Sequence, residues 1–288
     1  MFAVLTTVYP AALPFLDDFL QGLKNQTDRD FILFIVNDGV EALGELSSGQ
    51  VFEIRILEAS GTAAALRRQG IAWAEKEGAE WIILVDSDDI CTADRVARTR
   101  ATCGKADGLF NDLIPFGAQV SEETPLLSPH FREPDPVVPH ALVNSNFLGM
   151  SNTAARADLL AASAAQMPED LIAFDWALFT RMTLDGATIR YMDGAPTRYR
   201  QHADNIASPF NISDRQVLKG VAIKARHYEL FDPDGAPYDA LATGFANLQA
   251  RLNSDASFCQ EYCHAVRKNS PDFPLWWEPM KLPEELGL

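Results

Sequence analysis

The stretch WIILVDSDD, residues 81–89, decides the fold because it joins a solid apolar run to a group of carboxylates. Trp81 to Val85 has the length and the β-branched and aromatic content of a buried strand. Asp86, Asp88 and Asp89 follow it directly, and three neighbouring carboxylates repel each other unless a cation lies between them. A helix N-cap would account for one of these acids but not for three. We therefore expect a buried strand that ends in a divalent metal site.

Outward from this stretch, strand-like and helix-like segments alternate. Solid apolar runs separated by amphipathic helices are typical of a mostly parallel sheet covered on both faces, so the expected fold class is α/β. In the helix expected from residue 92, we place Asp94, Arg95 and Arg98 on the polar side. The other expected strands are 3–8, 31–36 and 51–57, and the other expected helices are 13–23 and 62–77.

The second half of the chain has a different sequence pattern. From about residue 107 the chain has short extended pieces and proline-rich loops, followed by an expected helix at 174–184 and strands at 188–192 and 197–200. From residue 213 the apolar periodicity is helical. A length of 288 residues favours roughly two domains. We expect a catalytic domain at residues 1–208 and a helical C-terminal extension at residues 209–288.

Composition excludes several classes of function. Lys and Arg number 24 against 40 Asp and Glu, so the net charge of −16 opposes general binding to nucleic acid or anionic lipid surfaces. Without a long apolar run or a secretion signal, we expect a cytoplasmic protein, with peripheral attachment to the inner face of the membrane left open. The four cysteines are expected as free thiols. Cys259, Cys263 and His264 lack the second ligand pair of a structural zinc site.

The candidate site residues follow the strands of the expected parallel sheet, where open α/β sheets bind their ligands. Thr7 and Tyr9 follow the first strand, Asp38 the second, and Asp86 and Asp88 the fourth. Oxygen ligands suit Mg²⁺ or Mn²⁺, which complete their shells with substrate phosphates and water. The sequence therefore predicts Mn²⁺ or Mg²⁺ as cofactor and a phosphate-bearing ligand.

Five segments in order carry a family resemblance: VLTTVYP (4–10), FILFIVNDG (31–39), LRRQGIAWA (66–74), WIILVDSDD (81–89) and a later segment that begins FDWALF (174–179) and contains YRQH (199–202). Over roughly residues 1 to 208 the chain resembles the family 2 glycosyltransferases of GT-A fold, rhamnosyltransferase-like members included. The resemblance implies an inverting, metal-dependent transferase. Its donor would be a UDP- or dTDP-linked sugar, and its acceptor a hydroxyl of a carbohydrate or lipid-linked molecule, in surface polysaccharide or glycoconjugate synthesis.

The resemblance also implies residue roles. Asp175 would be the catalytic base that accepts the proton of the acceptor hydroxyl, although Trp176 follows it and Phe174 replaces the usual preceding Glu. Asp175 could also serve only as a helix N-cap, and the Trp176 side chain either belongs to the core or lines a sugar site. Arg67 matches the arginine of an Ala-Arg-Asn pattern whose Asn is here Arg68, so either arginine is a candidate. The implied groups are Thr7, Tyr9, Asp38, Arg67 and Asp86 for the nucleotide, Asp88 and His202 for the metal, and Asn146, Gly149 and Trp176 for the acceptor or donor sugar.

Two alternatives stay open at this point. LVDSDDICT is similar to the motif of haloacid dehalogenase-type phosphohydrolases, in which Asp86 would be the nucleophile and Asp88 the general acid. That motif, however, normally follows the first strand of its domain. The other alternative is a protein of the same fold that binds a nucleotide or carbohydrate without catalysis, which Phe174 and Arg68 favour because they depart from the family pattern.

Overall fold

The computed structural model describes residues 1–41, 43–44, 51–117, 120, 123–202, 212–270 and 275–288. The chain forms two compact units. Unit 1 comprises residues 1–138, 148–170 and 178–203, and unit 2 comprises residues 139–147, 171–177 and 204–288. The boundary expected at residue 208 lies outside the described residues.

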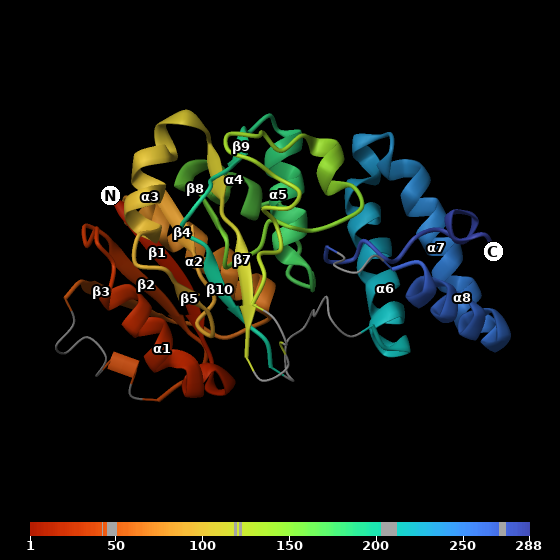
Figure 1. The fold of residues 1–288 in the computed structure, drawn as a ribbon, viewed down its shortest axis with the longest axis horizontal. Coiled ribbons are helices and arrows are strands. Elements are labelled where there is room, and N and C mark those ends of the chain that lie inside the picture. The colour runs from red at the N-terminus through yellow and green to blue at the C-terminus, as the bar shows by residue number, and fades with distance from the viewer. Residues whose placement is uncertain (42, 45–50, 118–119, 121–122, 203–211, 271–274) are drawn as a thin grey trace. The chain divides into compact units, whose positions relative to one another are not determined.

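The main sheet of unit 1 contains, among the described residues, seven strands in the order β3-β2-β1-β4-β8-β6-β9 (Figure 1). Neighbours from β3 to β4 are parallel, β8 is antiparallel to both β4 and β6, and β6 pairs with β9 in parallel. A smaller sheet has the order β5-β10-β7. The expected α/β fold with a mostly parallel sheet is confirmed. The strands are β1 Phe2–Val8, β2 Ile32–Asn37, β3 Glu53–Glu58, β4 Trp81–Leu84, β5 Ile90–Cys91, β6 Gly108–Phe110, β7 Leu113–Phe116, β8 Thr153–Arg156, β9 Ile189–Tyr191 and β10 Thr197–Arg200.

Helices cover both faces of this sheet, as side-chain alternation along the strands requires. On one face, Val4 of β1 belongs to the same apolar cluster as Phe19 of α1 (Leu13–Lys24) and Val96 of α3 (Arg95–Thr102). On the other face, the rings of Phe34 in β2 and Trp73 in α2 (Ala63–Lys76) meet edge to face at 4.8 Å. The expectation of helices on both faces is confirmed.

Helix α2 lies unusually close to the sheet because one of its residues is glycine. A Cβ at Gly70 would lie 2.7 Å from Cγ2 of Val36 and 3.1 Å from Cδ1 of Leu5. The N-cap residue of the helix is Thr62, whose hydroxyl accepts a hydrogen bond from the amide of Ala65 at 3.1 Å. This cap and the glycine contact fix the height of α2 above the ends of β1 and β2.

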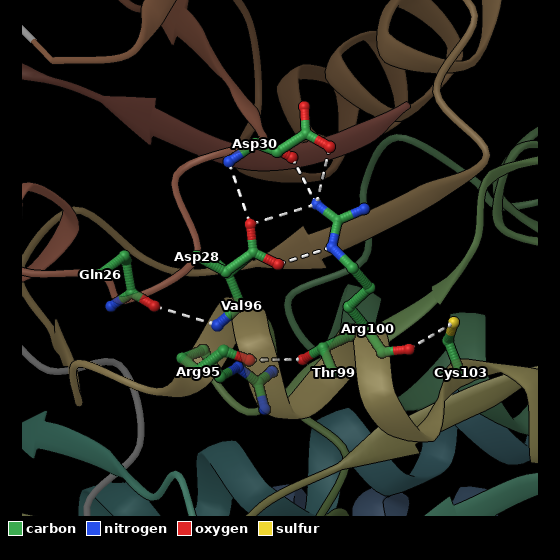
Figure 2. Close-up of polar contacts among 8 residues, drawn as sticks. All are labelled: Gln26, Asp28, Asp30, Arg95, Val96, Thr99, Arg100 and Cys103. Carbon is green, nitrogen blue, oxygen red and sulfur yellow. Dashed lines mark hydrogen bonds and ion pairs between the residues drawn. The ribbon is translucent and has the colours of Figure 1, made fainter.

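Helix α3 is hydrogen-bonded to residues 26–28, which follow α1 (Figure 2). The amide of Val96 donates to Oε1 of Gln26 at 3.0 Å, and Nε of Arg100 donates to Oδ2 of Asp28 at 2.6 Å. The Gln26 amide group also donates to the carbonyl of Thr92 at 2.7 Å. One buried glutamine therefore satisfies backbone groups at the entry of α3, where a helix leaves its first donors unpaired.

The expectation that Arg95 lies on the polar side of its helix is wrong. Its side chain is fully buried, and Nη1 donates to Oδ1 of Asn111. Because α3 begins at Arg95 rather than at Thr92, the buried stripe runs through Arg95, Thr99 and Thr102 at helical spacing. Burial lowers the pKa of Arg95 to about 10, and the side chain still carries its charge at neutral pH.

The remaining elements of unit 1 are short, apart from α5. They are the 3-10 turns Pro10–Ala12 and Cys103–Lys105, helix α4 (Ala157–Ala164) and most of α5 (Phe174–Leu184), whose first residues belong to unit 2. The sequence predicted α5 and the strand pieces β9 and β10. The short extended pieces expected from about residue 107 include β6 and β7, whereas β5 and β8 were not expected.

Unit 2 is helical, as the periodicity from residue 213 predicts. Helix α6 (Asp214–Phe231) begins with a capping box formed by Ser213 and Gln216. The core of unit 2 includes the fully buried side chains of Phe231, Phe245 and Tyr262. The other elements are α7 (Tyr238–Ser254), α8 (Ala256–Lys268) and the 3-10 turns Pro139–Leu142, Asp232–Asp234 and Pro283–Leu286.

No helix within the described ranges is both long and apolar enough to cross a lipid bilayer. The four cysteines are free thiols, as expected.

Candidate active site

A small pocket, open to solvent, lies at the carboxyl ends of β1, β2 and β4. This is the position at which open parallel sheets bind ligands. Three residues singled out from the sequence lie in its wall: Thr7, Arg67 and Asp86. The complete lining is Leu5, Thr6, Thr7, Val36, Leu66, Arg67, Gly70, Val85, Asp86 and Met150.

The arginine in this pocket is Arg67. Its Nη2 lies 3.4 Å from Oδ1 of Asp86, whose amide donates to Oγ of Ser151 at 3.0 Å. Arg68 instead forms an ion pair with Glu169 and donates to the carbonyl of Met167 at 3.3 Å. Of the two candidates from the sequence, Arg67 is therefore the one that lines the pocket, with a cation facing a carboxylate.

Tyr9 and Asp38 lie just beyond the ends of β1 and β2. The amide of Asp38 donates to the carbonyl of Val8 at 2.9 Å, so the two loops leave the sheet together. Partial burial, and then the carboxylates of Asp88 and Asp86, raise the pKa of Tyr9 to about 12. The phenol is therefore a neutral hydrogen-bonding group close to the acidic loop.

The Asp88 carboxylate and the His202 imidazole meet across 114 residues of chain. Oδ2 of Asp88 lies 3.0 Å from Nε2 of His202, and their side chains are 14% and 20% exposed. The imidazole also stacks on Phe15 of α1, with ring centroids 5.1 Å apart. The structure thus brings together the two residues that the sequence assigned to a metal.

Arg200 is a site residue that the sequence analysis did not single out. Nε donates to the carbonyl of Asp88 at 2.8 Å, Nη2 to Oδ2 of Asp18 at 2.7 Å, and the amide to Oδ1 of Asp89 at 2.7 Å. Its guanidinium lies over the ring of Phe15, 4.7 Å from the centroid. The YRQH segment that contains Arg200 was a signal for it. Arg200 ties the end of β10 to the acidic loop and thereby places His202.

The three carboxylates of the acidic loop have different surroundings. Asp89 is 1% exposed, and its burial and the carboxylates of Asp88 and Asp86 raise its pKa well above the ordinary value. Asp86 stays 38% exposed at the pocket. None of the three caps α3, whose N-cap residue is Asp94. Two of the acids are therefore available at the site, and the third is part of its support.

The residues present fit one kind of metal site and not another. No group of three or more His, Cys, Asp or Glu side chains among the described residues is arranged to hold a cation, so an all-protein cage is excluded for that part of the chain. Mg²⁺ and Mn²⁺ bound with nucleotides need only one or two carboxylates, because phosphate oxygens and water complete the shell. An Asp88 oxygen and a His202 nitrogen 3.0 Å apart match this second kind.

Three further candidates belong to unit 2. Asp175 lies in the first turn of α5, where its Oδ1 accepts the amide of Trp176 at 2.9 Å. Trp176 is fully buried, and its Nε1 donates to the carbonyl of Leu142 at 2.6 Å. Its indole thus belongs to the core and offers no face to a sugar, which corrects that expectation. Asn146 is 6% exposed, and its backbone amide donates a hydrogen bond to the carbonyl of Trp276 at 3.0 Å.

Comparison with known proteins agrees with this geometry. Residues 3–105, which include β1 to β4 and the whole acidic loop, match the model described as glycosyl transferase family 2. This N-terminal part of the chain is similar to the family 2 glycosyltransferases. Glycosyltransferase is therefore the enzyme class that the match supports. A comparison with curated proteins gave no match.

Solved structures share the fold of this chain over most of its length. The S. aureus TarS 1–349 structure in complex with UDP-GlcNAc is 18% identical, with a TM-score of 0.60 over 85% of this chain and 71% of that one. The mannosyltransferase PcManGT from Pyrobaculum calidifontis, in complex with GDP-Man and Mn²⁺, is 11% identical, with a TM-score of 0.53 over 89% of this chain and 75% of that one. Both are glycosyltransferases of GT-A type, so the expected GT-A fold is confirmed. The phosphohydrolase alternative gains no support from either comparison.

Proposed function

We propose that the protein is an inverting, metal-dependent glycosyltransferase that moves a sugar from a nucleotide diphospho-sugar to an acceptor hydroxyl. One observation carries this proposal. The pocket at the ends of β1, β2 and β4 contains Arg67 and Asp86, and the Asp88–His202 pair follows in the same loop region of unit 1.

The pocket is the proposed site of the nucleoside. Thr7 lines it, and Tyr9 and Asp38 lie just beyond the ends of β1 and β2. A carboxylate at Asp38 suits the imide N–H of uracil or thymine. A UDP- or dTDP-linked sugar is therefore the proposed donor, and the neighbour crystallised with UDP-GlcNAc supports it. Asp86 would accept a hydrogen bond from a ribose hydroxyl. Arg67, whose Nη2 lies 3.4 Å from Oδ1 of Asp86, would hold that carboxylate in place.

Asp88 and His202 are the proposed ligands of Mn²⁺ or Mg²⁺, the cofactor in this proposal. Bound there, the cation would supply positive charge to the departing diphosphate. The neighbour that holds Mn²⁺ with a nucleotide sugar supports this role. Arg200 holds the Asp88 loop through its main-chain carbonyl, so the carboxylate keeps its direction before any ligand arrives.

Asp175 is the proposed base. In an inverting transfer the acceptor oxygen attacks the anomeric carbon while the nucleoside diphosphate leaves from the opposite side. A carboxylate within hydrogen-bond reach takes the hydroxyl proton as the new bond forms. Asp175 is half-buried at a helix start, where the helix dipole favours its charged form. Gly149, next to Met150 of the pocket lining, is the proposed neighbour of the donor sugar.

The acceptor in this proposal is a carbohydrate or a lipid-linked hydroxyl, in the synthesis of a surface polysaccharide or glycoconjugate on the cytoplasmic side. Residues 1–208 are the proposed catalytic domain, followed by the helical extension at residues 209–288. The net charge of −16 does not oppose a small anionic donor, because the acidic loop recruits the cation that such a donor needs.

Calorimetric titration with UDP, dTDP and GDP, each with Mn²⁺ and again with EDTA, tests the proposal. We expect Mn²⁺-dependent binding of UDP or dTDP. Equal binding with the chelator present would contradict it. Donor turnover separates the enzyme from a binding protein of the same fold, because a catalytically inactive protein would bind the nucleotide and release none from a nucleotide sugar.

A further inference from the structure

The first turn of α5 has one side chain that is not buried, and that side chain is Asp175. All other side chains from Ala173 to Thr180 are buried. Oδ1 of Asp175 accepts the amide of Trp176 at 2.9 Å, so the carboxylate is held by the backbone of the next residue. The position of Asp175 therefore depends in part on what fixes Trp176.

Helix α6 of unit 2 fixes the Trp176 indole. The imidazole of His227 stacks on it with ring centroids 3.7 Å apart and planes within 7°. Ordinary aromatic pairs lie roughly 4.5–7 Å apart, so this stack is close. Tyr228 meets the same indole edge to face at 6.1 Å and donates to the carbonyl of Val143 at 2.9 Å. With the Nε1 bond to Leu142, the indole is held in its plane and against one face.

The choice of histidine at this position is costly, which indicates a specific use. His227 is 2% exposed, and neither ring nitrogen has a hydrogen-bond partner among the described residues of the chain. Burial lowers its pKa well below the ordinary value, and Lys224 on the same helix lowers it further, so the ring is neutral at neutral pH. An aliphatic side chain would avoid the cost, but it would not give a flat surface to the indole.

We propose that His227 is a positioning residue for Asp175 and acts through the stack on Trp176. The inference rests on the proposed role of Asp175 as the base. It gives the helical extension a function in catalysis: α6 supplies the surface that fixes the start of α5. Catalytic groups must be held by packed neighbours, since a displacement of about 1 Å can cost on the order of 100-fold in rate.

The Trp176 amide proton, followed by NMR in a pH titration of the full chain, tests the inference without any substrate. In the wild-type protein its shift should change as the Asp175 carboxyl is protonated, and the change should vanish in Asp175→Asn. His227→Ala should lose most of this change. The matched control is Val266→Ala, which truncates a buried side chain of α8 and should keep it.

An unchanged Trp176 titration in His227→Ala would overturn the inference. If His227→Ala does not fold, His227→Leu serves instead, because an aliphatic side chain fills the site but gives no flat surface to the indole. We expect it to shift the indole Nε1 proton and to weaken the amide titration. If both signals stay as in wild type, the proposal fails.

Release of UDP from UDP-GlcNAc, with Mn²⁺ present and water as acceptor, gives a second readout. His227→Ala should lower kcat about 10- to 100-fold and leave the Kd for UDP unchanged. The double variant with Asp175→Asn should be no slower than Asp175→Asn alone, whereas additive losses would contradict positioning. If Asp175→Asn loses no activity, the proposed base is what fails, and the amide titration still decides the inference.

Discussion

Replacing Gly70 by alanine sets two effects on stability against each other: the higher helix propensity of alanine and the close approach of α2 to the sheet. In an exposed helix interior, Gly→Ala stabilises by about 1 kcal/mol. Here the new Cβ would lie 2.7 Å from Cγ2 of Val36, a short β-branched side chain that is fully buried. Apolar carbon atoms prefer about 3.5–4.0 Å, so helix or strand must move by about 1 Å.

Overpacking of this kind costs about 1–3 kcal/mol, which exceeds the gain in propensity. We therefore expect Gly70→Ala to destabilise unit 1 by about 1–2 kcal/mol. Because Gly70 also lines the pocket, one turn from Arg67, we expect Mn²⁺-dependent UDP binding to weaken as well. The matched control is Gly104→Ala, where the added Cβ meets nothing within 4 Å.

Native-state hydrogen exchange of the β1 amides measures the change in unit 1 separately from unit 2. Calorimetry with UDP and Mn²⁺ measures the effect on the pocket. A Gly70→Ala protein at least as stable as wild type would refute the reasoning, because it would mean that propensity outweighs the contact with Val36. A loss of the same size in Gly104→Ala would refute it too.

Three further predictions concern buried polar groups. Burial lowers the pKa of Lys224 to about 7 from 10.5, so between these pH values the unfolded chain binds more protons than the folded chain. The free energy of unfolding of unit 2 therefore falls by about 1 kcal/mol for each pH unit as the pH decreases from 10.5 to 7. Lys224→Met should flatten this slope in denaturant titrations at several pH values, and an equal slope would contradict the assignment. Asn111→Ala should destabilise unit 1 by about 2–3 kcal/mol in hydrogen exchange, because it removes the partner of the buried Arg95 guanidinium; a neutral effect would mean that water replaces the amide. Asp112→Asn should cost about 1–2 kcal/mol, since the carboxylate accepts three backbone amides at 2.7 to 2.8 Å, and unchanged exchange at those amides would show that the charge is not needed.

The parts of the fold that local pattern determines were predictable. WIILV has no polar residue and the length of a strand, and β4 is fully buried between β1 and β8. Thr62 and the apolar spacing after it marked α2 to within a residue or two at each end. By contrast, β8 reads Thr-Ala-Ala-Arg, which has no strand signature. It is a strand because it pairs with β4 and β6, and such pairing depends on tertiary context.

The site was predictable in its residue types but not in its arrangement. The order of motifs indicated Asp88 and His202 separately, and only the folded chain shows them 3.0 Å apart. Nothing in the sequence distinguishes the buried Asp89 from the exposed Asp86, because burial depends on how β10 covers the loop through Arg200. The burial of Arg95 was not predictable from its charge, since it needs a partner 16 residues away.

The most direct test of the central claim is the Kd of UDP, measured by calorimetry with Mn²⁺ and with EDTA, in wild type and in Asp88→Ala. The control is Asp185→Ala, which removes an exposed carboxylate just after α5 that pairs with Arg181 four residues earlier. The account predicts that Mn²⁺ tightens UDP binding in wild type and in Asp185→Ala, and that Asp88→Ala abolishes the metal effect. Tight UDP binding that ignores both the metal and Asp88 would contradict it.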